Sequence, residues 1–147
     1  MIRELVFIVS GYLMGGILFA RLAAALLRRP NVVEGSEDGN PGTANAFQYG
    51  GALCGVITLL GDLNKGFWPL YFYQKSGGNF DARPLLSALV LMAPVWGHAF
   101  PAQFHFQGGK GVACSTAVVL LIHPLCGLPS ILLCVLVIAV TKYISLG

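Results

Sequence analysis

The stretch LVFIVSGYLMGGILFARLAAALL, residues 5–27, decides the fold class because it holds one charged residue, Arg21. A helix rises 1.5 Å per residue, so a stretch of this length crosses a hydrocarbon layer about 30 Å thick. We therefore predict one membrane-spanning helix over residues 5–27. The alternative is a signal peptide cleaved near Ala23, Ala24 and Ala25. Arg21 lies between that site and the apolar stretch, which argues against cleavage.

The composition of the whole chain points the same way. Hydrophobic residues make up 56% of the 147 residues and charged residues 10%, with a mean hydropathy of +0.74. Soluble domains contain about 25% charged residues, so the composition argues against a soluble monomer. The formal net charge is +3 without a basic run, which excludes a nucleic-acid partner. The four cysteines lie in apolar runs without the spacing of a zinc site, and we expect no metal.

Further apolar stretches follow at residues 49–73, 84 to about 104, 112–122 and 128–144. The break between the last two is predicted from His123, Pro124, Gly127 and Pro129. Together with residues 5–27, these stretches predict an all-α integral membrane protein. We expect a single polytopic domain over residues 1–147, a helical bundle of about five hydrophobic segments with two glycine-rich loops on one side.

Two ionisable residues, Asp62 and Lys65, interrupt the second stretch. Residues three apart lie on one face of a helix, so the two side chains can form an ion pair. Ionisable groups at membrane depth usually face a partner or a wet cavity. Both interpretations, a structural pair and a cavity lining, stay open from the sequence.

The two segments richest in glycine and polar groups are EGSEDGNPGTANAF at 34–47 and FQGGKGVACST at 106–116. Three predicted crossings place both on the same side of the membrane, and Lys and Arg in these loops favour the cytoplasm. Clustered glycines let backbone N–H groups turn inward around an anion, and a helix that starts after each loop adds its positive end. The pattern suits a phosphate site, but each loop taken alone also fits a plain turn between helices, so both interpretations stay open from the pattern. It is not a P-loop, because Gly111 occupies the position of the magnesium-binding Ser or Thr.

These motifs resemble those of the bacterial acyl-phosphate:glycerol-3-phosphate acyltransferases, membrane enzymes that make lysophosphatidic acid. Four segments match in order: GGILFARL at 15–22, GNPGTAN at 39–45, DLNKG at 62–66, and GHAFPAQFHFQGGKGVA at 97–113. The last of these is long and specific. The segment ISLG at 144–147 is similar to the family's S-S-L-G, so the resemblance extends along essentially the whole chain.

The chain departs from the family pattern at several positions. Thr43 and Ala44 reverse the usual order, and Gln48 replaces an arginine that could bind phosphate in a bidentate way. The family serine before GNPG corresponds to Ser36, if two residues are inserted, or to Asp38 without a gap. The family is also longer, so the chain is expected to be either a fragment or a reduced relative.

The resemblance implies transfer of a fatty acyl group from acyl phosphate to the 1-hydroxyl of glycerol 3-phosphate, releasing phosphate. No cofactor is expected; the expected partners are these two substrates and membrane lipid. Catalytic roles are predicted for Lys110, His98, Ser36 and Ser145. Substrate contacts are predicted for Gly39, Asn40, Gly42, Asn45, Gly108, Gly109, Gly111, Asp62 and Lys65. The implied location is the bacterial inner membrane, with both glycine-rich loops in the cytoplasm.

Two other functions stay open from the sequence. A non-catalytic membrane relative, which binds anions or acts as a scaffold, is suggested by Gln48 and by the shortness of the chain. A small anion transporter is suggested by Asp62 and Lys65 within a span, although the chain shows no inverted repeat.

Overall fold

The computed structural model of the chain describes residues 1–29 and 32–141; of the side chains in 134–141 it describes that of Leu136. Within these residues the structure is helical and contains no strand. The elements in chain order are α1 (Ile2–Gly15), α2 (Phe19–Leu26), α3 (Thr43–Gly50), α4 (Ala52–Lys75), α5 (Pro84–Ala99), the 3-10 helix η1 (Ala102–Phe104), α6 (Val112–Ile122) and α7 (Pro124–Thr141). The predicted all-α class is confirmed.

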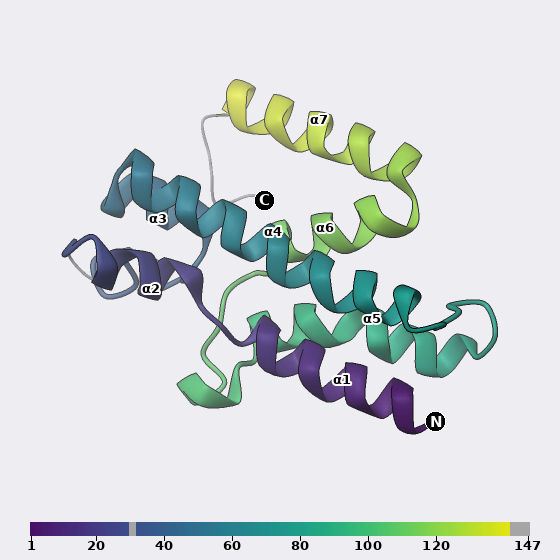
Figure 1. Ribbon diagram of the computed structural model, residues 1–147. Helices are drawn as coiled ribbons and strands as arrows, with labels where there is room; N and C mark the ends of the chain where they lie inside the picture. Colours follow the sequence, from purple (N-terminus) through teal and green to yellow (C-terminus); the bar gives the residue numbers. More distant parts are fainter. Residues whose placement is uncertain (30–31, 142–147) are drawn as a thin grey trace.

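Helix α4 forms the centre of the molecule (Figure 1). It contacts α1, α2, α3, α5 and α6, whereas α7 packs against α6. α1 and α5 lie side by side, and small residues allow this approach. A Cβ atom at Gly15 would lie 2.1 Å from the carbonyl oxygen of Pro94, and one at Gly97 2.0 Å from that of Tyr12. The backbones of α1 and α5 therefore touch at Gly15 and at Gly97.

The span predicted over residues 5–27 is broken into two helices in the structure. α1 ends at Gly15 and α2 begins at Phe19, with a bend of 43° between the two helices. At the break, Lys65 Nζ of α4 donates a hydrogen bond of 2.6 Å to the carbonyl oxygen of Ile17. A carbonyl released from helical hydrogen bonding in an apolar environment needs such a donor. The sequence analysis could not identify this partner, which lies 48 residues away.

The second predicted span also differs from the structure. Residues 49 and 50 belong to α3, and α4 starts only at Ala52. Gly51 separates the two helices with φ of +86°, a conformation that favours glycine. α4 then continues through Asp62, Lys65 and Pro69 to Lys75 without interruption. The charged residues do not break the helix because they are paired within the bundle.

The remaining spans agree better with the predictions. Pro84–Phe104 is long and apolar enough to cross a membrane, and α6 has the predicted bounds. The last helix starts at Pro124, not at residue 128, because proline is well tolerated in the first turn. Its predicted end at residue 144 lies outside the described residues. By length and composition, the described part of the chain offers one spanning helix, or two when α1 and α2 count as one broken span.

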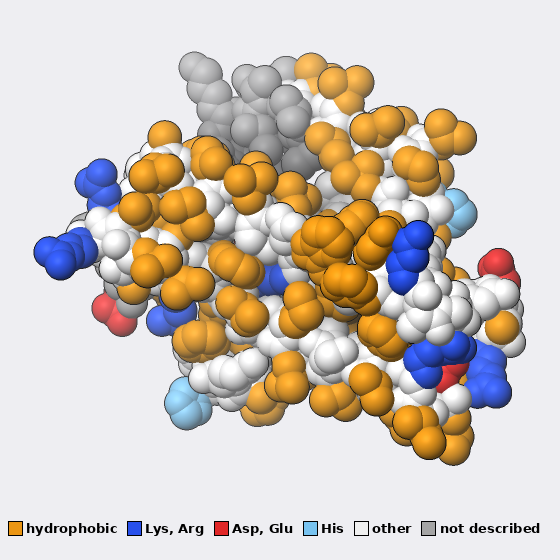
Figure 2. All heavy atoms as spheres, viewed as in Figure 1, with side chains coloured by type: hydrophobic (Ala, Val, Ile, Leu, Met, Phe, Trp, Pro, Cys, Tyr) orange, Lys and Arg blue, Asp and Glu red, His pale blue; other side chains and the backbone are white. Residues whose placement is uncertain are grey.

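Apolar side chains cover much of the molecular surface (Figure 2). Among them are Leu5, Val9, Leu60, Phe72 and Leu132, each more than half exposed. Most charged side chains in this view gather toward two opposite ends of the molecule. A wide apolar surface between two charged ends fits a protein that is surrounded by lipid.

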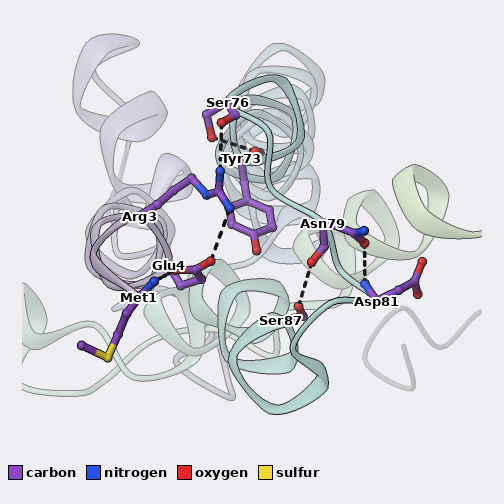
Figure 3. A network of polar contacts seen from close by, with 8 residues as sticks. All are labelled: Met1, Arg3, Glu4, Tyr73, Ser76, Asn79, Asp81 and Ser87. Carbon is purple, nitrogen blue, oxygen red and sulfur yellow. Dashed lines mark hydrogen bonds and ion pairs between the residues drawn. The ribbon is translucent and has the colours of Figure 1, made fainter.

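A polar network closes the end of the bundle near the N-terminus (Figure 3). Arg3 donates a hydrogen bond of 3.1 Å to the carbonyl oxygen of Ser76 and lies over the ring of Tyr73. The buried carboxylate of Glu4 pairs with the N-terminal ammonium and with Arg3. These contacts fix the start of α1 to the end of α4. The two glycine-rich loops lie toward the opposite end of α4 (Figure 1).

Candidate functional site

The first glycine-rich loop folds around the carboxylate of Asp38. Asn45 Nδ2 donates to Asp38 Oδ1 at 2.7 Å and to the carbonyl oxygen of Asn40 at 2.8 Å. The backbone N–H of Asn40 donates to the same Asp38 oxygen at 3.1 Å. Gly39 makes the turn between them with φ of +63°. Asp38 is therefore held as an anion at the start of α3.

These contacts change the acidity of Asp38, which lies in the loop outside the helices. The hydrogen bond from Asn45 is the largest cause that lowers the pKa of this carboxyl, and the Asn40 N–H and the charge of Lys110 lower it further, whereas partial burial opposes them. A lowered pKa means that the folded loop stabilises the ionised form. The loop thus favours a negative group at this point.

The second glycine-rich loop packs tightly against His98 of α5. The Gly109 N–H donates a hydrogen bond of 3.0 Å to the carbonyl oxygen of His98. A Cβ atom at Gly109 would lie 2.3 Å from His98 Nε2, and one at Gly108 would lie 2.0 Å from the His98 carbonyl oxygen. Glycine is required at both positions for steric reasons. The Gly109 amide, which the sequence analysis expects to face a ligand, is instead used within the protein.

The loop ends where α6 begins. Gly111 has φ of +75° and precedes the first residue of α6. α3 likewise begins directly after Gly42. Each helix therefore starts inside the predicted segment, directly after its last glycine, and each start directs unpaired N–H groups and a positive partial charge toward the glycine-rich part.

The two loops meet, as we expected from their predicted position on the same side of the membrane. Lys110 Nζ lies 3.6 Å from Asp38 Oδ2, and these side chains are 44% and 38% exposed. A Cβ atom at Gly109 would also lie 3.1 Å from Asn40 Oδ1. Asn45 and Lys110 therefore approach the same carboxylate from different loops. The contact is open to solvent, so a ligand anion can reach it.

Two further oxygen atoms at this place are buried and accept or donate no hydrogen bond among the described residues: Asn40 Oδ1 and Thr43 Oγ1. Most buried polar atoms have a partner, so such atoms often mark a ligand or water position. The sequence analysis did not name Thr43 as a site residue. The available signal was a hydroxyl residue in the first turn of a helix that follows Pro41-Gly42.

Of the two predicted catalytic serines, Ser36 is not part of this contact. Ser36 Oγ donates a hydrogen bond of 2.9 Å to the carbonyl oxygen of Val33 within its own turn. Ser145 lies outside the described residues. Asp38, which the sequence analysis considered only as an alternative to Ser36, is the residue that joins the two loops.

Asp62, Lys65 and His98 form a separate cluster beneath the loops. All three residues are 2% exposed. Lys65 Nζ lies 2.8 Å from Asp62 Oδ1, which confirms the predicted ion pair. The same carboxylate oxygen lies 3.7 Å from His98 Nδ1. The cluster is closed to the surface, so Asp62 and Lys65 do not line an open cavity in this structure.

Comparison with known proteins identifies relatives along almost the entire chain. The family model described as glycerol-3-phosphate acyltransferase matches residues 5–147. A glycerol-3-phosphate acyltransferase of Paraburkholderia xenovorans is 33% identical over 145 residues, which cover 99% of this chain and 67% of the relative. One from Azotobacter vinelandii is 36% identical, covering 95% of this chain and 71% of the relative.

Two solved structures share the fold. Both are crystal structures of PlsY (YgiH), an integral membrane glycerol 3-phosphate acyltransferase. The glycerol 3-phosphate form superposes with a TM-score of 0.86 at 32% identity, over 97% of this chain and 69% of that chain. The lysophosphatidic acid form gives 0.81 at 33% identity, over 97% and 68%.

Proposed function

Because this chain belongs to the glycerol-3-phosphate acyltransferase family, we propose that it is an integral membrane enzyme that acylates glycerol 3-phosphate. The acyl donor in this proposal is a fatty acyl phosphate. The products are lysophosphatidic acid and inorganic phosphate, so the reaction belongs to phospholipid biosynthesis.

The proposed reaction is a single acyl transfer. The 1-hydroxyl oxygen of glycerol 3-phosphate attacks the carbonyl carbon of the acyl phosphate and forms the ester bond. The bond between that carbon and the phosphate oxygen breaks, and phosphate leaves with the electron pair. The hydroxyl proton passes to the leaving phosphate. Since the acyl group is already activated, the protein mainly positions two anions and balances their charge.

The observation that carries the proposal is the meeting of Lys110 and Asn45 at one carboxylate. A carboxylate and a phosphate oxygen accept the same donors, so the position of Asp38 Oδ1 and Oδ2 marks where a phosphate group can bind. The starts of α3 and α6 add two positive helix ends to this position.

The predicted site residues of the two loops have roles in this proposal. Lys110 supplies the positive charge, and Asn45 supplies an N–H donor. The glycines at 39, 42, 108 and 111 and the side chain of Asn40 shape the two loops around the anion. Ser36 and Ser145 act as polar contacts to substrate. His98 is sealed beneath the loop, which favours orienting Gly108 and Gly109 over direct contact with substrate.

The proposed location is the bacterial inner membrane, with the glycine-rich loops in the cytoplasm. Arg28, Arg29 and Lys110 lie at the loop end of the bundle, and positive residues favour the cytoplasmic side. A single cysteine introduced at Glu37 in the cysteine-free chain tests the sidedness. A membrane-impermeant maleimide should label this cysteine in inverted vesicles and not in intact cells. Labelling of intact cells would show that the loops face the outside of the inner membrane.

The activity is tested with the purified full chain in detergent, supplied with acyl phosphate in the presence and absence of glycerol 3-phosphate. We expect phosphate release that depends on the acceptor and matches the lysophosphatidic acid formed. Phosphate release that ignores the acceptor contradicts the proposal. Lys75→Met, a substitution at the opposite end of α4, should leave the rate unchanged.

A non-catalytic relative that binds anions is a second candidate function, and the exposed Gln48 of α3 favours it. An amide cannot replace the family arginine as a bidentate phosphate donor. Under this alternative, the protein binds glycerol 3-phosphate in calorimetry, but no labelled lysophosphatidic acid forms. Gln48→Arg should then restore product formation.

A further inference from the structure

The strongest feature that the proposed site leaves unused is the buried cluster of Asp62, Lys65 and His98. Its three side chains come from α4 and α5 and are closed to solvent. Burying an ionised side chain is costly unless every charge has a partner. We therefore ask which partner each ionisable side chain of the cluster has.

Lys65 has well-placed partners. Its ammonium lies 2.8 Å from Asp62 Oδ1, donates to the Ile17 carbonyl at the break between α1 and α2, and lies 5.8 Å from the centre of the Phe19 ring. The ammonium thus ties the broken span to α4. It also fixes the carboxylate of Asp62, because one oxygen of that group is held by the ion pair.

His98 is placed differently. Its Nδ1 faces Asp62 Oδ1 at 3.7 Å and has no hydrogen-bond partner among residues 1–29 and 32–141. The distance is longer than a hydrogen bond, but the carboxylate is the acceptor that the structure offers on this side. The opposite ring nitrogen, Nε2, packs against Gly109. The imidazole therefore lies between the buried carboxylate and the glycine-rich loop.

We propose that Asp62, held by Lys65, is the positioning residue for His98: it keeps the imidazole with Nδ1–H toward α4 and Nε2 toward the 107–111 loop. A carboxylate that accepts from one ring nitrogen fixes both the tautomer and the orientation of a histidine. The backbone and ring of His98 then form the wall against which Gly108 and Gly109 pack. Asp62 influences the position of Lys110 only through His98 and the glycines that pack against it. Asp62 itself touches no substrate.

The tautomer of His98 tests the proposal without any substrate. The full chain with His105→Asn and His123→Gln keeps His98 as its single histidine, and both replaced residues are exposed. Nitrogen-15 NMR of the labelled protein in detergent should show a protonated Nδ1 and an unprotonated Nε2. An Nε2–H tautomer, or a doubly protonated ring, overturns the proposal. This spectrum, recorded with Asp62 and Lys65 unchanged, decides the question even where a variant at those positions fails to fold.

A double variant tests the role of the carboxylate. Asp62→Leu with Lys65→Met removes both charges together, which avoids an unpaired buried charge. We expect the His98 nitrogen signals to shift toward the Nε2–H form or a mixture of tautomers. The matched control is Asp81→Asn with Lys75→Met, at the far end of α4. Unchanged His98 signals in the folded Asp62 and Lys65 variant overturn the proposal.

The effect on activity rests on the proposed acyltransferase function. The double variant should lose about a hundredfold in kcat/KM, because small misplacement of a binding loop has effects of that size. Asp62→Glu, made alone in the wild-type chain, keeps a carboxylate and should keep the Nδ1–H tautomer. Its rate should lie between those of the wild type and the double variant. If no variant or wild-type protein is active, the acyltransferase assignment fails, whereas the NMR result still decides the positioning role.

Discussion

The carboxylate of Asp38 and the ammonium of Lys110 lie 3.6 Å apart across two loops that are 72 positions apart in the chain. Asn45 and the backbone of Asn40 bind the other oxygen of this carboxylate. Asp38 therefore occupies the donors that a substrate phosphate needs.

Replacing Lys110 with Met should slow acyl transfer markedly. The change keeps most of the side-chain volume and removes one charge-assisted hydrogen bond to phosphate, about 1.5–3 kcal/mol, or roughly ten- to a hundredfold in kcat/KM. Lys75→Met is the control for a lost positive charge at an exposed position of α4. Steady-state rates with varied glycerol 3-phosphate give the measurement. Equal rates for the two variants would place the phosphate elsewhere.

Replacing Asp38 with Asn should strengthen the binding of glycerol 3-phosphate. The amide keeps the size of the side chain but removes a negative charge from the phosphate position. A unit charge at about 4 Å in water contributes ~1 kcal/mol, so we expect about a fivefold lower dissociation constant in calorimetry. Glu37→Gln removes a neighbouring exposed charge and is the matched control. Weaker binding by Asp38→Asn shows that the carboxylate organises the loop and does not compete with substrate.

The stability of the loop should depend on pH through Asp38. Its hydrogen bond from Asn45 lowers the pKa of the folded carboxyl below the unfolded value, near 3.9. The ionised form is thus favoured by folding. This contribution is complete above the unfolded pKa and disappears as the pH falls through the folded pKa. The difference in unfolding free energy between wild type and Asp38→Asn should therefore be constant from about pH 5 to 7, which is above the unfolded pKa. The difference should shrink below about pH 4. A difference that grows at acidic pH has the wrong sign.

Replacing Gly109 with Ala should displace the second loop. The added methyl group would lie 2.3 Å from His98 Nε2, and the buried imidazole has little space to move. We expect at least about a hundredfold loss in kcat/KM. Gly77→Ala is the control, because Gly77 lies in the opposite loop with φ of +82° and only Arg3 nearby. It introduces backbone strain without changing the site, so its rate should stay near that of the wild type.

The sequence alone predicts the membrane class, the meeting of the two loops and the Asp62–Lys65 pair, because each depends on local pattern or on motif order. It does not predict the break at Ile17, because the compensating donor, Lys65, is brought there by tertiary packing. It also misses Asp38 as the residue that joins the loops. Its role depends on Lys110, and no local pattern connects residues that distant.

The contact between α1 and α5 gives the last prediction, which concerns stability. Gly15→Ala would place a methyl group 2.1 Å from the Pro94 carbonyl oxygen, so the two backbones must separate. Gly11→Ala on the same helix meets its nearest side-chain atoms at 3.4 Å, an ordinary contact. Overpacking costs about 1–3 kcal/mol, so Gly15→Ala should lower the free energy of unfolding by that amount, and Gly11→Ala should change it little. Unfolding in mixed detergent micelles measures both. Because α5 carries His98, Gly15→Ala should also lower the acyl-transfer rate, and equal stability of the two variants would show that this helix contact is loose.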